Sequence, residues 1–234
     1  MLIEHTILGN DMQAVEVTLQ PGQELVAEAS TLLAMDEGIS FEARVGDGSS
    51  KSGGLMGALG RAVTGAGVFL THFENGGSGP AKVSFAANSP GRIVPIHLPD
   101  WGNVIKVEHS GFLCATKGTH INAKRANRIR AGVFGGAGFF LQQLEGDGTA
   151  FLHCCGSVIE RTLDNEVLRC EPGAVVAFDQ GLDFSIERAG NLKTMMFGGD
   201  GVFLATIRGS GKVIMQSLPW GRVVSHILAQ ASSK

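Results

Sequence analysis

A six-residue motif that occurs three times constrains the fold of this chain more than any other feature. The copies GAGVFL, GAGFFL and GDGVFL begin at Gly65, Gly136 and Gly199. Each copy is followed by a glycine-containing turn and a second apolar run, over residues 76–85, 146–154 and 209–217. Glycine supplies the positive φ that tight hairpin turns require, so each copy predicts a β-hairpin.

A second pattern recurs between these motifs. Residues 159–187 align with the N-terminal residues 15–43, with Ala177 at the position of Ala34, and residues 94–121 form a looser version. The chain therefore opens with the second half of a repeat and ends with the first half of one. Circular closure is the simplest account, in which the C-terminal hairpin pairs with the N-terminal strands and hides sheet edges.

The sequence thus predicts an all-β fold in one domain, residues 1–234, built from β-sandwich or barrel-like units in three pseudo-symmetric, circularly closed repeats. The predicted repeats cover about 65–130, about 136–190, and 199–220 completed by 10–45. The composition agrees, because 34 glycines and a charged fraction of only 18% favour short strands with tight turns.

Two segments fall outside the repeat. Residues 46–63 begin as a Gly/Ser-rich loop and then place Leu55, Met56 and Leu59 at helical spacing, which predicts one short loop helix. Exposed apolar side chains on a long loop predict a contact site for a partner or a membrane, or else a cover over an open end of the barrel. Residues 219–234 predict a short amphipathic C-terminal helix, packed on the body or on a neighbouring subunit.

These motifs, the stretch PGRIVPIHL at 90–98 and the closing GSGKVIMQS resemble the altered-inheritance-of-mitochondria twenty-four family over nearly the whole chain. That family has long been described as a domain of unknown function. The resemblance implies a β-sandwich-like fold similar to the tryptophan RNA-binding attenuation protein, with the unit repeated three times. Eukaryotic members look like mitochondrial inner-membrane organisers. The resemblance brings no catalytic residues with it.

Candidate chemistry is sparse. The glycine motifs lack the Lys-Ser/Thr of a phosphate-binding loop, and no GxSxG nucleophile elbow is present. His153, Cys154 and Cys155 are adjacent, but on a strand Cys154 would point away from the other two. No CxxC or HExxH spacing accompanies them. We therefore predict no catalytic, metal-binding or cofactor-binding residues.

Four acidic residues recur at aligned positions. Asp36 and Asp179 each precede an x-Gly pair and are predicted to form turns. Glu28 and Glu171 fit either a solvated strand face or a shared polar site, and the first interpretation is favoured.

Charge and composition set the remaining expectations. The net charge of −3 argues against nucleic acid as a partner. The start lacks the features of a signal peptide, and no apolar run is long enough to span a membrane, so we expect a cytoplasmic protein that could contact a membrane peripherally. The four cysteines are then expected to be free thiols.

The function that these observations favour is a non-enzymatic, homo-oligomeric β-scaffold that acts through contacts with a protein partner or a membrane surface. A small-ligand or nucleic-acid binding module is the alternative, and a metal-dependent enzyme is a third possibility.

Overall fold

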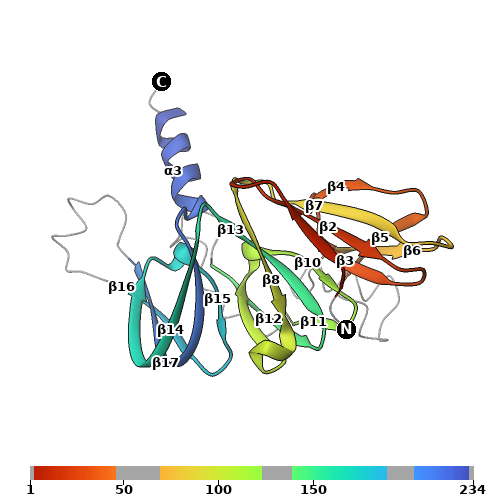
Figure 1. Cartoon of the computed structure of the whole chain (residues 1–234). Helices are drawn as coiled ribbons and strands as arrows, with labels where there is room; N and C mark the ends of the chain where they lie inside the picture. The colour runs from red at the N-terminus through yellow and green to blue at the C-terminus, as the bar shows by residue number, and fades with distance from the viewer. Residues whose placement is uncertain (1–2, 46–68, 123–138, 189–202, 232–234) are drawn as a thin grey trace.

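A computed structural model of the protein describes residues 3–45, 69–122, 139–188 and 203–231. These residues form mainly antiparallel strands (Figure 1). The described part contains one α-helix, α3 (Trp220–Ala231), at the C-terminal end. The predicted all-β class and C-terminal helix are therefore confirmed. The predicted loop helix within residues 46–63 lies outside the described residues.

The strands fall into three groups along the chain. In the first group β7 lies between β2 and β4 in one sheet, and β6 lies between β3 and β5 in another. The short strand β1 is added to the edge of β2. The strands of this first group are β1 (His5–Leu8), β2 (Ala14–Leu19), β3 (Glu24–Glu28), β4 (Leu32–Met35), β5 (Ile39–Val45), β6 (Phe69–Asn75) and β7 (Ala81–Ala86).

The second group has the same pairing pattern. β13 lies between β8 and β10, and β12 lies between β9 and β11. Its strands are β8 (Gly91–His97), β9 (Val104–Glu108), β10 (Phe112–Thr116), β11 (Thr119–Asn122), β12 (Leu141–Gly146) and β13 (Thr149–Cys155). Two 3-10 turns, η1 (Leu98–Trp101) and η2 (His109–Gly111), connect them.

In the third group two long strands take the place of four. The N-terminal half of β17 lies between β14 and β16, and its C-terminal half lies between β14 and β15. The elements are β14 (Val158–Cys170), η5 (Pro172–Ala174), β15 (Val175–Asp179), β16 (Asp183–Arg188) and β17 (Phe203–Gln216).

Neighbouring groups share sheets. β3 of the first group pairs with β10 of the second, and β9 of the second pairs with β15 of the third. Each of these two joints is antiparallel and continues a sheet from one group into the next. The groups are therefore connected in a row by backbone hydrogen bonds as well as by side-chain packing.

The predicted hairpins are wrong. β6 and β7 belong to different sheets, as do β12 and β13. Beside β14, the N-terminal half of β17 pairs with β16 and its C-terminal half with β15. The glycines mark a bend at which the chain crosses from one sheet to the other. Gly146 and Gly209, with φ of 124° and 122°, supply the unusual backbone conformation at two of these bends.

The predicted circular pairing is also wrong for the described residues. β17 pairs with β14, β15 and β16, which precede it directly, and not with strands of residues 10–45. The N-terminal strands pair instead with β6, β7 and β10. Sequence similarity identifies equivalent segments, but a repeat can be divided at any point along its period, so similarity alone does not say which segments pair.

Asn75 fixes the bend between β6 and β7 from inside the protein. Its side chain is fully buried, and Nδ2 donates to the backbone oxygens of Leu19 and Gly79 at 2.7 and 2.9 Å. Its Oδ1 accepts from the backbone N–H of Gly77 at 2.9 Å. The side chain thus satisfies three backbone groups that the bend withdraws from the sheets.

We predict that Asn75→Ala lowers the free energy of unfolding by about 2 kcal/mol, because it removes all three hydrogen bonds and leaves buried backbone groups unsatisfied. Urea denaturation would measure this. Asn10→Ala is the matched control, since Asn10 is exposed, and it should change stability by less than about 0.5 kcal/mol. Equal effects of the two substitutions would contradict the role given to Asn75.

Candidate functional site

The contact residues predicted from the sequence, Leu55, Met56 and Leu59, lie outside the described residues. The described strands and helix contain other groups that could carry a function.

The adjacent residues His153 and Cys155 do come together, as expected for alternate positions of a strand. The Cys155 sulfur lies 3.9 Å from His153 Nδ1 and 3.1 Å from the Ser89 hydroxyl. Cys154 points the other way, into an apolar core cluster. Both His153 and Cys155 are buried.

The electrostatics of this pair disfavour a catalytic thiolate. Burial raises the pKa of the Cys155 thiol, and burial lowers the pKa of His153. A nucleophilic cysteine beside a histidine needs the opposite shifts, toward a thiolate and an imidazolium. Burial also raises the pKa of Cys154 to about 12 and that of Cys170 to about 11. These thiols are neutral at physiological pH and act as packing groups.

No group of three or more metal-ligating side chains lies together in the described part of the chain. All four cysteines are free thiols, as predicted.

The aligned acids behave differently from their predicted roles. The Asp36 and Asp179 carboxylates accept hydrogen bonds from the backbone N–H groups of Lys82 and Lys212, at 2.8 and 2.5 Å. They therefore tie a turn to the strand that follows the glycine bend, 46 and 33 residues away, and do not only stabilise their own turns. Residue type predicted the turn, but not this long-range partner.

Glu28 and Glu171 are not brought together by any interaction within the described residues. Burial raises the pKa of Glu28, and its Oε2 is buried without a hydrogen-bond partner among the described residues. Glu171 forms an ion pair with Arg222 of α3. The sequence interpretation missed the corresponding residue of the second group, Glu108, which follows VIKV as Glu28 follows ELVA.

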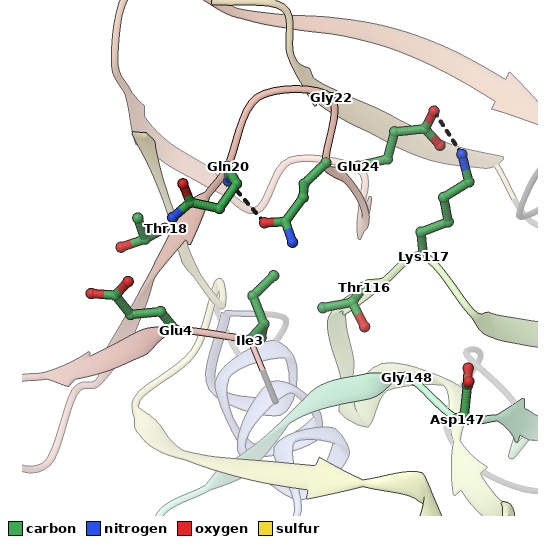
Figure 2. Close-up of a pocket in the computed structure, with 11 residues that line it drawn as sticks. Ile3, Glu4, Thr18, Gln20, Gly22, Glu24, Thr116, Lys117, Asp147 and Gly148 are labelled. Atoms are coloured by element: carbon green, nitrogen blue, oxygen red, sulfur yellow. Dashed lines mark hydrogen bonds and ion pairs between the residues drawn. The ribbon is translucent and has the colours of Figure 1, made fainter. Parts of the chain in front are cut away.

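An open pocket of about 460 Å³ lies where the first and second groups meet. Figure 2 shows Gln20 and Gly22 on one side of it and Asp147 and Gly148 on the opposite side. On its wall Lys117 forms an ion pair with Glu24 at 3.0 Å. The other charged residues of the lining are acidic, Glu4 and Asp147, so the pocket disfavours anionic ligands such as phosphates.

Exposed large apolar side chains are grouped within one strand or helix at two places in the described structure. One is the edge strand β4, where Leu32, Leu33 and Met35 all face solvent. The other is α3, which projects from the strands (Figure 1) and has no buried residue. The exposed apolar side chains of α3 are Trp220, Val224, Ile227 and Leu228.

The helix therefore does not bury its apolar side on the body, which was one of its two predicted positions. Packing on a neighbouring subunit stays a prediction. The exposure of β4 could not be seen in the sequence, because Leu-Leu-Ala-Met has the composition of a buried strand. None of the helices in the described ranges is long and apolar enough to cross a membrane.

Comparisons with known proteins agree with this architecture. The sequence model of the family described as "Mitochondrial biogenesis AIM24" matches residues 5–218. A protein of Streptococcus pyogenes serotype M6, whose name says only that it is uncharacterized, is 30% identical over 206 residues, which are 87% of this chain and 81% of the relative. A crystal structure of a Streptococcus pyogenes protein has a TM-score of 0.77 at 24% identity, covering 97% of this chain and 99% of that one. At this identity the last match supports the fold alone.

We predict that His153 makes the folded state sensitive to mild acid. Its pKa is lowered in the folded state, so below pH 6.5 the unfolded chain takes up a proton that the folded chain does not. The stability that the neutral imidazole contributes is present above that pH and is lost as the pH falls. Urea denaturation should show a loss between about pH 7.5 and 5 that is larger in the wild type than in His153→Gln.

The exposed His226 of α3 provides the control, because His226→Gln should follow the wild type at both pH values. A wild type and a His153→Gln variant with parallel pH profiles would contradict the prediction.

Proposed function

The chain belongs to the Mitochondrial biogenesis AIM24 family, and from that premise we propose that it is a non-enzymatic, oligomeric β-scaffold that acts through contacts with other protein surfaces. The observation that carries this proposal is the exposed apolar surface of α3 and β4. Exposed apolar patches of this kind are typical of interaction sites. The polar groups in the described interior, by contrast, form no arrangement suited to a nucleophile.

As part of this proposal, the three strand groups are equivalent repeats, divided after β7 and after β13. Three observations support the equivalence. The pairing pattern is the same in each group. A register shift occurs at one matching place, between Leu32 and Ala34, between Phe112 and Cys114, and between Val175 and Ala177. A side chain holds the strand after each bend, through hydrogen bonds from Lys82 to Asp36, from Thr149 to Thr116 and from Lys212 to Asp179.

The composition of α3 favours a protein contact over a lipid contact. Helices that bind anionic membrane surfaces carry several basic residues on the polar face. Within α3 the one Lys or Arg side chain is Arg222, which is paired with Glu171. Its apolar face is therefore better suited to another apolar protein surface than to charged lipid.

A small-ligand binding module is the second candidate, and the pocket in Figure 2 is the observation that favours it. Its volume lies within the range of small-molecule sites. Glu4, Glu24 and Asp147 in its lining suit a cationic or hydroxyl-rich ligand, and the net charge of −3 does not suit nucleic acid.

Native mass spectrometry of the purified protein separates these two functions. An oligomer of unmodified chains supports the scaffold. A monomer at micromolar concentration overturns the oligomeric proposal, and a stoichiometric organic mass would move the function to the pocket.

For α3 we predict that Ile227→Glu weakens self-association by about tenfold or more, because a charge would enter an apolar contact. Ile227 is 56% exposed in the chain, so the substitution should leave folding intact. Sedimentation velocity over a dilution series measures the effect. Ser225→Glu, on the polar side of the helix, should sediment like the wild type.

Flotation with anionic vesicles belongs to the same experiment. Flotation of the wild type but not of Ile227→Glu would assign the helix to a membrane surface and overturn the protein contact.

A further inference from the structure

The two joints between groups are built alike. Ala27 of β3 faces Cys114 of β10, and both side chains enter one core cluster. Val107 of β9 faces Ala177 of β15 in the same way. Because Cys114 and Ala177 each follow directly on the residue at the register shift, the two joints have the same register.

Each end of the row has one strand edge that is equivalent to one side of these joints and has no partner strand in the described part of the chain. β4 occupies in the first group the position of β10 and β15, since it has the same register shift before Ala34. Residues 166–170 of β14 occupy in the third group the position of β3 and β9, since they pair with the strand that begins in the motif copy at Gly199. In the described part of the chain, no strand pairs with the outer edge of either segment.

Burial shows what the two edges lack. Leu33 of β4 is 61% exposed, whereas the corresponding residues Leu113 of β10 and Val176 of β15 are each 1% exposed. On the other edge Leu168 is half-buried, whereas the corresponding residues Leu25 of β3 and Ile105 of β9 are each 0% exposed. Side chains that the internal joints bury thus remain at least partly exposed at both ends.

We propose that the β4 edge of one copy pairs antiparallel with residues 166–170 of β14 in a second copy, in the register of the two internal joints. This rests on the proposed scaffold function and names its self-association surface. Transferring the register aligns Ala34 with Cys170 and Met35 with Arg169. At the second joint the equivalent pair, Phe178 and Lys106, is in contact, with the Lys106 Nζ 5.5 Å from the ring centre.

A second copy fits these edges better than the other end of the same chain. Figure 1 shows β4 and β14 at opposite ends of the row of strands. The open edge of β14 is also continuous with α3, because Glu171, the residue after Cys170, binds Arg222 at the start of that helix. A copy that docks on β14 would therefore lie close to the start of α3. The contact joins unlike surfaces, so a closed ring is expected to follow if the rotation permits.

A disulfide tests the register directly. Ala34→Cys would place a thiol opposite the native Cys170, at a Cβ separation that a disulfide can bridge in a register pair. Oxidation with diamide at about pH 8.5, near the pKa of an exposed thiol, followed by non-reducing electrophoresis, should give covalent oligomers that a reductant returns to monomers. Ala34→Cys combined with Cys170→Ser should stay monomeric on the same gel.

Met35→Cys provides the register control, because adjacent strand residues point to opposite faces. It should form covalent oligomers at least about tenfold more slowly than Ala34→Cys. Equal rates for the two variants would overturn the register.

The outcomes distinguish this inference from the scaffold function. If native mass spectrometry shows an oligomer but the Ala34→Cys variant forms no disulfide with Cys170, the edge pairing is overturned and the scaffold remains. A disulfide between the new thiol of the Ala34→Cys variant and Cys170 of the same chain would appear as an oxidised monomer. It would show that the two edges meet within one chain and would overturn the pairing between two copies. A monomer by native mass spectrometry overturns both.

Charge at the edge gives an independent measurement. Leu33→Asp should weaken self-association by at least about tenfold, because it would place a carboxylate in the pairing surface. Met12→Asp is the matched control, since Met12 is 75% exposed outside both edges, and it should associate like the wild type. Full association of the Leu33→Asp variant would overturn the proposal.

Discussion

The fold depends on one constraint. A single stretch of chain must leave one sheet and enter another while keeping the correct strand register in both. Glycines make the bend possible, and a side chain from an adjacent turn then holds the strand beyond it. This hydrogen bond joins Asp36 to Lys82, Thr116 to Thr149 and Asp179 to Lys212. It helps to set the register in which the second half of the crossing strand begins, where a slip of one residue would exchange its buried and exposed faces.

The sequence could predict the strands but not how they pair. Glycine-flanked apolar runs indicate strands with turns between them, and this much is confirmed. A hairpin turn and a crossing bend use the same residue types, so the glycines around Gly146 and Gly209 cannot tell the two apart. The pairing is decided by long-range contacts, such as Asn75 Nδ2 with the Leu19 oxygen across 56 residues, which leave no local pattern.

The site was less predictable than the fold, because the proposed function concerns which surfaces stay uncovered. Leu32 and Val175 are both apolar residues at matching positions of a strand, yet one is exposed and the other is buried. The difference lies in what packs against the strand and not in the residue. The alternation of His153 and Cys155 was predictable from strand geometry, whereas the direction of their pKa shifts required knowledge of burial.

Sharing sheets between groups has a consequence for how the protein is made. As the chain is synthesised, β3 emerges early, but the strand that covers its outer edge, β10, is still to come, and β13, which pairs with β10 on its other side, follows later still. The first group is therefore synthesised before β10, and during that time the apolar outer edge of β3 has no partner strand. Such edges invite pairing with other chains. Sharing sheets between groups therefore stiffens the folded protein but exposes an unpaired sheet edge during synthesis. We expect chaperones to bind this nascent state.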